Sequence, residues 1–339
     1  MPSDVPSAPP APAPDRRTLV LRALKSAPSG VSGEALAREL GVSRAAVGKH
    51  VSALRGLGYT IDAAPGSGYR LIASPDAPLP LEVAPLLRSS LWNDLRGGRV
   101  TGSTNDDVRA LAAAGAPEGL VVLASEQRAG RGRLGRAWAS APGGVYASVL
   151  LRPSLAPAEL SPLALVVGLG LAHGLESLGA CVRLKWPNDV LDEAGGGKLA
   201  GILLEGMTEV ERMRWIVAGF GVNVRRSGLP SVAQATAPAP AYLDDLTPAP
   251  VPLAAVASTL LDGIADAYAH FLADGFARDL KPEYESRLAL VGVTVRVSDP
   301  YGTPIAEGTC EGVDEWGRLV VRRDGDTRHV SAGDVTLRR

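Results

Sequence analysis

The stretch GRGRLGRAW at residues 130–138 distinguishes a dinucleotide-binding α/β fold from an α/β fold with an anion-binding loop. Its glycines match the spacing GxGxxG, which in a dinucleotide-binding fold opens a helix and precedes an acidic residue by about twenty positions. Here the triplet PGG at 142–144 interrupts any helix, and no Asp or Glu lies between Gln127 and Ala158. The dinucleotide interpretation therefore fails. The stretch instead predicts an arginine-rich loop whose backbone N–H groups and guanidinium groups bind an anion. On this segment alone, an RNA-binding loop or a merely solvated one remains an alternative.

Strand-like and helical runs alternate on both sides of this loop. The strand-like runs occupy 120–125, 145–151, 182–186, 200–205 and 215–224, and the helical runs occupy 104–114, 163–178 and 252–273. This alternation predicts an α/β (α+β) domain with a mixed sheet. A Pro/Ala-rich insertion at 228–250 is expected to form a surface loop.

Two further motifs follow the loop along the chain. KWPND at 185–189 ends a strand-like run, where α/β proteins commonly bind ligands, and KLAGI at 198–202 comes shortly after it. Asp189 offers a carboxylate for Mg²⁺, and Lys198 offers a positive charge for phosphate or carboxylate oxygens. A P-loop is excluded because Leu199, rather than Ser or Thr, follows Lys198. Together with the arginine-rich loop, these residues predict a site for two anions and a metal ion.

The distribution of histidines narrows the chemistry. The four histidines, at 50, 173, 270 and 329, all lie far from the loop in sequence, and no Gly-x-Ser-x-Gly motif is present. A nucleophile activated by histidine is therefore not expected. Activation of a carboxylate by ATP needs no protein nucleophile, because cations that bring two anions together and stabilise the charge on the α-phosphate are sufficient.

The first part of the chain differs in composition from the rest. Between Asp15 and Ile72 it carries nine Lys and Arg against four Asp and Glu, although the whole chain has a net charge of −1. Helices are predicted over 16–26, 33–40 and 43–57, with Ser32 and Ser43 as N-caps and Gly41 in the turn between the last two. This is the helix-turn-helix arrangement, and YTIDAAPGSGYRL at 59–71 predicts a hairpin, or wing, with Pro65-Gly66 at its tip.

The third helix is expected to enter the major groove of DNA. Ala45 and Ala46 give the start of this helix a small cross-section that fits the groove, and Arg44 is of the residue type that pairs with guanine. The predicted DNA-binding residues are Ser43, Arg44, Lys49 and His50 on the helix and Arg70 on the wing. A three-helix interaction module without a role in DNA binding is the alternative.

The ends of the chain and its bulk composition complete the domain assignment. Short alternating runs after Leu288, broken by DPYG, DEWG and RDGD, predict a small β-barrel. Two cysteines without metal-ligand spacing fit a reducing cytoplasm, and no run of about eighteen apolar residues predicts a membrane span. The expected parts are a disordered Pro/Ala tail (1–15), a winged helix-turn-helix domain (16–74), a linker (75–85), an α/β domain (86–287) and an SH3-like β-barrel (288–339).

Taken in chain order, several motifs resemble the biotin–protein ligase family. They are STN at 103–105, Gln127, GRGRLGRAW, KWPNDV, KLAGILLE and GFGVN at 219–223. SRAAVGKHVSALRGLGY at 43–59 and PGSGYRL at 65–71 resemble the DNA-binding domain of the bifunctional bacterial members. The resemblance implies a ligase that makes biotinyl-5′-AMP from biotin and ATP with Mg²⁺. The same enzyme would then transfer biotin to a lysine of the biotin carboxyl carrier protein of acetyl-CoA carboxylase. It would also bind operator DNA and repress biotin biosynthesis genes. It also implies a homodimer formed in response to biotinyl-AMP, with a constitutive dimer as the alternative.

The resemblance also implies roles for individual residues. Biotin would be held by Ser103, Thr104, Asn105 and Gln127, and the loop residues Arg131, Gly132 and Arg133 would close over it and over biotinyl-AMP. Lys198 would contact the biotin carboxylate and the reacting phosphate, while Trp138 would stack on adenine. Asn188 and Asp189 would help to place phosphates and Mg²⁺, and Asn223 would line the nucleotide end. Lys198, Arg133 and Asp189 are the predicted catalytic residues.

Two other functions compete with this one. A biotin-sensing transcription factor with a decayed ligase site is disfavoured because Arg133, Asp189 and Lys198 are all intact. A lipoyl or other acyl-adenylate ligase is disfavoured by the arginine-rich loop.

Overall fold

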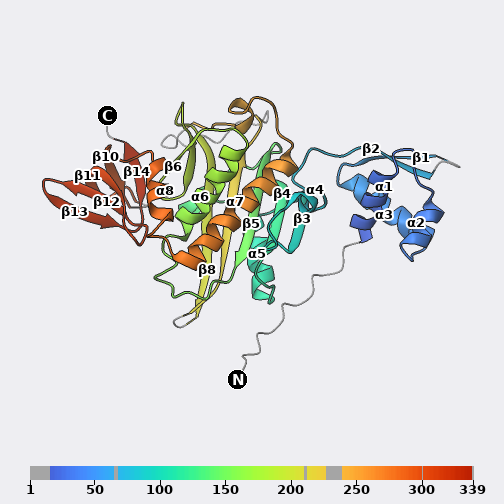
Figure 1. Cartoon of the computed structure of the whole chain (residues 1–339), viewed down its shortest axis with the longest axis horizontal. Helices are drawn as coiled ribbons and strands as arrows, with labels where there is room; N and C mark the ends of the chain where they lie inside the picture. The colour runs from blue at the N-terminus through green and yellow to red at the C-terminus, as the bar shows by residue number, and fades with distance from the viewer. Residues whose placement is uncertain (1–15, 65–67, 210–211, 227–238, 300, 338–339) are drawn as a thin grey trace, which may run out of the picture. The chain divides into compact units, whose positions relative to one another are not determined.

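The computed structural model describes residues 16–64, 68–209, 212–226, 239–299 and 301–337, and it divides into two compact units between Asp76 and Ala77 (Figure 1).

The first unit is a winged helix-turn-helix domain, as predicted. It consists of α1 (Arg16–Ser26), α2 (Gly33–Glu39), α3 (Arg44–Gly56) and the antiparallel pair β1 (Thr60–Ala64) and β2 (Gly68–Ala73). The Ser32 and Ser43 side chains accept the N–H groups of Ala35 and Ala46, so both predicted N-caps are confirmed. The buried side chains of the helices form the core: Val20, Leu21, Leu24, Leu36, Val47, Val51 and Leu54. The predicted wing tip at 65–66 lies outside the described residues.

A seven-stranded mixed sheet forms the centre of the second unit. Its strand order is β3-β4-β5-β9-β8-β7-β6, and only the β3–β4 pair is parallel. The strands are β3 (Asp94–Thr101), β4 (Leu120–Gln127), β5 (Gly144–Leu151), β6 (Val182–Lys185), β7 (Asp189–Asp192), β8 (Lys198–Glu209) and β9 (Arg212–Asn223).

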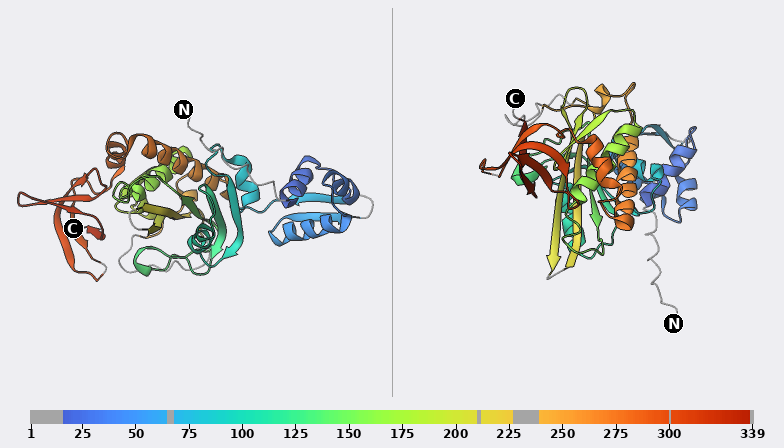
Figure 2. Two further views of the ribbon diagram at one scale, coloured as in Figure 1. Left: turned by 90° about the horizontal axis from the view of Figure 1, so that it is seen from below. Right: turned by 60° about the vertical axis from the view of Figure 1, so that its left-hand side comes forward.

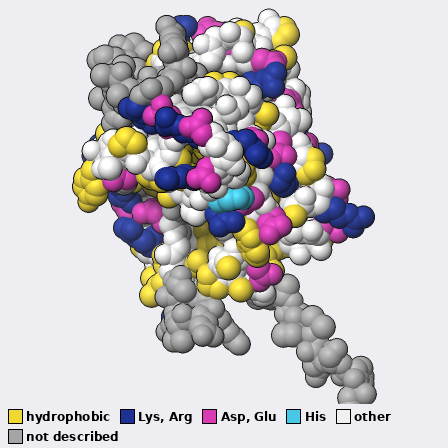
Figure 3. All heavy atoms as spheres, turned by 90° about the vertical axis from the view of Figure 1, so that its left-hand side faces the viewer, with side chains coloured by type: hydrophobic (Ala, Val, Ile, Leu, Met, Phe, Trp, Pro, Cys, Tyr) yellow, Lys and Arg dark blue, Asp and Glu magenta, His cyan; other side chains and the backbone are white. Residues whose placement is uncertain are grey.

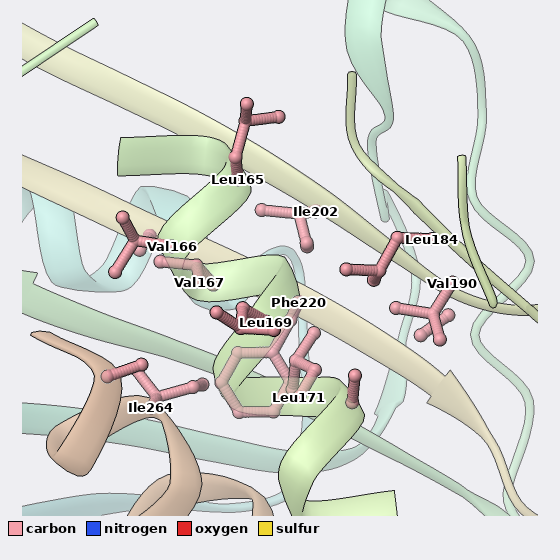
Figure 4. Packing of buried hydrophobic residues seen from close by; sticks show 14 of the residues in the cluster. Leu165, Val166, Val167, Leu169, Leu171, Leu184, Val190, Ile202, Phe220 and Ile264 are labelled. Atoms are coloured by element: carbon pink, nitrogen blue, oxygen red, sulfur yellow. The ribbon is translucent and has the colours of Figure 1, made fainter. Parts of the chain in front are cut away.

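Helices cover both faces of this sheet (Figures 1 and 2). On one face lie α6 (Leu163–Ser177) and α7 (Leu253–Asp274), and on the other lies α5 (Thr104–Ala113). Val121 and Leu123 of β4 belong to the core under α6 and α7, whereas Val122 belongs to the core under α5. Because successive strand residues point to opposite faces, a continuous apolar strand needs cover on both sides. Figure 4 shows the packing of α6 against strand residues such as Ile202 and Phe220.

The C-terminal part is an antiparallel five-stranded sheet with the order β13-β12-β11-β10-β14, consistent with the predicted SH3-like domain. Its strands are β10 (Thr294–Ser298), β11 (Pro304–Val313), β12 (Leu319–Arg323), β13 (Asp326–Val330) and β14 (Asp334–Leu337). The turns that join β10 through β13 fall at the three predicted breaks. Figure 3 shows acidic and basic side chains interspersed on the face that this part presents, in keeping with ion pairs such as Arg322–Glu311.

Some elements had no counterpart in the sequence prediction. The segment expected as a linker contains the short helix α4 (Pro80–Val83), which continues into a 3-10 turn at Ala84–Leu86. The strands β3 and β7 and the helix α8 (Leu280–Arg287) also have none. Within the insertion at 228–250, the described part contains a 3-10 turn at Leu243–Asp245. No helix among the described residues is long and apolar enough to cross a membrane.

Candidate functional site

A cavity of about 620 Å³ opens above the carboxyl ends of β3 and β4 and the start of β8. The arginine-rich loop borders it, and so do turns of the C-terminal sheet. All the ligand-contacting residues predicted from the sequence line this one cavity: Ser103, Thr104, Asn105, Gln127, Arg131, Gly132, Arg133, Trp138, Asn188, Asp189, Lys198 and Asn223.

One end of the cavity is neutral and rich in hydrogen bonds. The Thr104 backbone N–H and hydroxyl both donate to Gln127 Oε1, at 2.9 and 3.1 Å. The Gln127 amide donates in turn to Ser140 Oγ at 2.9 Å. Ser103, which precedes α5, is 4% exposed and lines the cavity together with Thr104 and Asn105 of the first turn of the helix.

Ser148 joins two of these polar residues, although sequence reasoning did not identify it. Its hydroxyl is fully buried on β5 and lies 2.7 Å from Thr104 Oγ1 and 2.6 Å from Asn105 Oδ1. The Asn105 amide donates to Glu205 Oε2 at 2.7 Å. A serine in the middle of the apolar run VYASVLL was the available signal, because a buried hydroxyl needs a partner.

Two glycines of β9 make room for this arrangement. A Cβ at Gly219 would lie 1.9 Å from Asn105 Oδ1, and one at Gly221 would lie 2.4 Å from Trp138 Nε1. Any larger residue would therefore push the asparagine or the tryptophan out of place. This close approach explains in physical terms why the motif GFGVN contains two glycines.

The arginine-rich loop is a short hairpin. Gln127 and Ser140 form a bridge at its base, Arg131 and Ala137 form another, and the Gly132 N–H donates to the Arg136 carbonyl at 2.7 Å. Leu134 at the tip has φ 58° and ψ 30°, a left-handed backbone conformation that residues other than glycine rarely adopt.

The other end of the cavity carries an excess of positive charge. Lys198 Nζ lies 2.6 Å from Asp189 Oδ1 and 5.1 Å from the centre of the Trp138 ring. Arg133 Nη1 lies 3.4 Å from Asn188 Oδ1 and 3.5 Å from the Gly333 carbonyl. Burial lowers the pKa of the Arg133 guanidinium, which Asp189 partly offsets.

Lys185 lies at the same end and was not identified as a site residue from the sequence. It lines the cavity, and burial lowers its pKa, with Asp189 acting in the opposite sense and Lys198 adding to the effect. Arg136, also missed, forms an ion pair with Asp334 at the start of β14. No sequence pattern connects residues 198 positions apart.

The amides of Asn188 and Asn223 fix the backbone around Lys198. Asn188 Nδ2 donates to the Ile202 carbonyl at 2.8 Å, and Asn223 Nδ2 donates to the Lys198 carbonyl at 3.1 Å. Both side chains therefore hold the motif KLAGI in register while they line the cavity.

Arg131 differs from Arg133 in its surroundings. Although it lines the cavity, its guanidinium forms a two-pronged ion pair with Asp106 of α5, at 2.6 and 2.7 Å. The family resemblance implied that this arginine closes over the ligand, whereas in the structure its charge is paired with a carboxylate of the protein.

The predicted DNA-binding residues all lie in the first unit. Arg44 and Lys49 are exposed on α3, and His50 is half-buried there. The Ser43 hydroxyl accepts the Ala46 N–H at 3.1 Å and therefore serves as a cap. Arg70 on the wing is 3.3 Å from Asp62 Oδ2 and remains half exposed.

Comparison with known proteins gives consistent matches along the chain. The Biotin/lipoate A/B protein ligase family matches residues 97–223, an HTH domain matches 16–70, and the Biotin protein ligase C terminal domain matches 291–338. The bifunctional ligase/repressor BirA of Bacillus subtilis is 31% identical over 91% of this chain and 94% of its own length. The biotin--[acetyl-CoA-carboxylase] ligase of Mycobacterium tuberculosis is 37% identical over 72% of this chain and 89% of its own.

A solved structure agrees with these matches. The biotin protein ligase from Aquifex aeolicus in complex with biotin and ATP is 28% identical, with a TM-score of 0.61. The similarity covers 73% of this chain and 99% of that one.

Proposed function

The chain belongs to the biotin–protein ligase family, and we propose that it is a bifunctional member: an ATP-dependent ligase that biotinylates a carrier protein and a DNA-binding repressor of biotin biosynthesis genes. The carrier we propose is the biotin carboxyl carrier protein of acetyl-CoA carboxylase, and the compartment is the reducing cytoplasm, in keeping with the free Cys181 and Cys310.

One observation carries the ligase assignment. The same cavity has a neutral end of hydrogen-bonding groups and a cationic end where Lys185, Lys198 and Arg133 surround Asp189. A bicyclic urea such as that of biotin needs donors and acceptors, and a triphosphate needs positive charge. Because the two ends share one cavity, a carboxylate and an α-phosphate can meet within it.

Two half-reactions follow from this geometry. In the first, a biotin carboxylate oxygen attacks the α-phosphorus of ATP, and pyrophosphate leaves with the electrons of the broken P–O bond. Lys198 and Arg133 reduce the repulsion between the two anions and stabilise the negative charge on the oxygens of the α-phosphate in the transition state. In the second, a neutral lysine amine of the carrier attacks the acyl carbon, AMP leaves, and the amine gives up a proton.

The individual residues have the roles implied by the family. Ser103, Thr104, Asn105 and Gln127 hold the biotin rings, Trp138 stacks on adenine, and Asn223 lines the nucleotide end. Gly132 lets the loop backbone approach the ligand, and Asn188 helps to place the phosphates.

Asp189 fits a role in binding Mg²⁺. Its buried Oδ1 is paired with the Lys198 ammonium at 2.6 Å, and the carboxylate lies beside the predicted phosphate contacts, so it is an oxygen ligand of the kind that Mg²⁺ prefers. The described residues contain no group of three or more His, Cys, Asp or Glu side chains that would hold a metal by themselves. Mg²⁺ is commonly bound by one or two carboxylates together with substrate phosphates, so Asp189 would hold it only with the nucleotide present. When bound, the ion supplies charge neutralisation of the phosphates.

The repressor function rests on the first unit. Arg44 and Lys49 on α3 are exposed, as reading and phosphate-contacting residues must be, and Arg70 lies on the wing. We propose that a homodimer, promoted by biotinyl-AMP, presents two such units to a palindromic operator. Sedimentation of the full chain with and without biotinyl-AMP tests this. A dimer of unchanged stability and unchanged operator affinity would remove the ligand-dependent step and leave the ligase function intact.

Biotin-dependent exchange of pyrophosphate into ATP tests the ligase function. We expect exchange with biotin and none with lipoate. Exchange with lipoate alone would assign the chain to the lipoyl ligases, and operator binding without exchange would make it a biotin sensor.

A further inference from the structure

Four charged side chains form a compact group beside the neutral end of the cavity, and we call them the loop-base cluster: Asp106, Arg109, Arg131 and Glu205. Arg131 pairs with Asp106 at 2.6 Å and with Glu205 at 3.6 Å. Arg109 pairs with the same two carboxylates, at 2.5 and 3.5 Å. The cluster contains two charges of each sign, so its charges are balanced before any ligand binds.

Within this cluster, Arg131 and Asp106 form the best-defined pair. Both nitrogens of the guanidinium fork donate to the carboxylate, a geometry that gives strong and specific charge-assisted hydrogen bonds. The Arg131 hydrogen bonds lower the pKa of the Asp106 carboxyl, and the pKa of Arg131 is raised in turn by its hydrogen bond to Asp106. Arg131 therefore cannot offer its guanidinium to an anionic ligand without giving up this partner.

The cluster connects three parts of the ligand site. Arg131 comes from the hairpin loop, Asp106 and Arg109 from α5, and Glu205 from β8. Glu205 also accepts the amide of Asn105, which belongs to the neutral end of the cavity. Asp106 is not among the residues that line the cavity, so a change there would reach the ligand site through Arg131.

We propose that Asp106 is a positioning residue that holds the arginine-rich loop against the neutral end of the cavity through Arg131 and so determines how long biotinyl-AMP is retained. The proposal rests on the ligase function given above and refines the role of Arg131. The reacting groups lie at the other end, where Lys198 and Arg133 act, so the pair governs retention of the intermediate rather than its formation.

The test uses the full chain with Asp106→Asn, which keeps the shape of the side chain and removes its charge. We expect release of preformed biotinyl-AMP to become about tenfold faster, equivalent to about 1.4 kcal/mol, with the single-turnover rate of adenylation within twofold of the original. Asp106→Glu should bring release back to within threefold. Asp107→Asn is the matched control, because Asp107 lies in the same helical turn but accepts from the Thr101 hydroxyl at 2.5 Å. Its release rate should stay within twofold.

A double-mutant cycle separates action through the pair from a direct contact between Arg131 and the ligand. If Arg131 acts through Asp106, Asp106→Asn/Arg131→Gln releases biotinyl-AMP no faster than the faster single variant. Multiplied effects, or a release rate for Asp106→Asn within twofold of the original, would overturn the proposal.

Hydrogen exchange without ligand provides a readout that does not require ligase activity. The Gly132 and Arg136 amides, which donate within the hairpin, should exchange faster in Asp106→Asn than in Asp107→Asn. Equal exchange in the two variants would contradict the proposed attachment. If the original chain made no biotinyl-AMP, the ligase function would fail, while this measurement would still decide whether Asp106 holds the loop.

Discussion

Replacing Lys198 by alanine should reduce adenylation by at least about a hundredfold while leaving the chain folded. Lys198 Nζ is held 2.6 Å from Asp189 Oδ1, at the end of the cavity where the phosphates are expected. Two unit charges 4 Å apart interact by about 4 kcal/mol at an effective dielectric constant of 20. Losing about 2.7 kcal/mol of that interaction in the transition state corresponds to a hundredfold loss of rate.

The same substitution affects stability, and the two effects need to be separated. Only 15% of the Asp189 side chain is exposed, so loss of its counter-charge should destabilise the fold by about 2 kcal/mol, less than for a fully buried pair because Arg133 and Lys185 remain nearby. In Lys198→Ala/Asp189→Asn most of that stability should return, but not the activity. Lys281→Ala is the matched control, since that lysine forms a similarly half-buried pair with Glu285 at 2.9 Å, away from the cavity.

The assay is biotin-dependent pyrophosphate exchange, accompanied by thermal unfolding of each variant. A folded Lys198→Ala protein whose exchange rate lies within tenfold of the original would refute the role given to this lysine.

Three further predictions follow from the same geometry. Deletion of residues 1–76 should abolish operator binding in a gel-shift assay and leave the rate of pyrophosphate exchange within threefold of the original. Arg44→Ala in the full chain should weaken operator binding about tenfold or more. Unchanged operator affinity of Arg44→Ala would mean that α3 is not the reading helix. Ser148→Ala should raise the KM for biotin about tenfold with a smaller change in kcat, because it removes the donor to Asn105 Oδ1 and one of the two hydrogen bonds of the Thr104 hydroxyl. An unchanged KM would argue against the hydrogen-bonded end as the biotin contact. The pKa of Asp106 is lowered from its ordinary value of 3.8, so its pair with Arg131 is fully formed above that pH and is lost only as the pH falls through the lowered pKa. Loss of this pair should therefore not accelerate the release of biotinyl-AMP between pH 8 and pH 5. An acceleration in that range that Asp106→Asn abolishes would contradict the assignment.

The sequence predicted those parts of the fold whose pattern is local. The run Leu120–Gln127 is apolar over its first residues, and β4 lies between two covered faces, so composition and environment agree. β3 was missed because DLRGGRVT is polar and contains Gly97 and Gly98. None of its residues is buried, so it needs no apolar pattern, and its place at the edge of the sheet is set by its pairing with β4.

The candidate site shows the same division. Every predicted ligand-contacting residue lines one cavity, because these residues belong to motifs whose chemistry can be read from residue type and spacing. The partner of Arg131 could not be read in this way. Asp106 precedes it by 25 positions on a helix, and the two charges meet because α5 packs against β4, the strand that leads into the loop. The pairing of Arg136 with Asp334, at the start of β14, could not be predicted either, because these two residues are still farther apart in the sequence.

Burial of Lys185 in the candidate site lowers the stability of the folded state. Burial lowers its pKa, and Lys198 and Arg136 lower it further, so the protonated ammonium is less stable here than in water. By linkage, a lysine with a lowered pKa destabilises the folded state at every pH below its unfolded value. Lys185→Met should therefore raise the unfolding temperature at pH 7 while slowing pyrophosphate exchange about tenfold or more, since it removes positive charge from the phosphate end. A variant that is both less stable and fully active would show that the lysine supports the fold rather than the reaction, and the excess of cations around Asp189 would then need a different explanation.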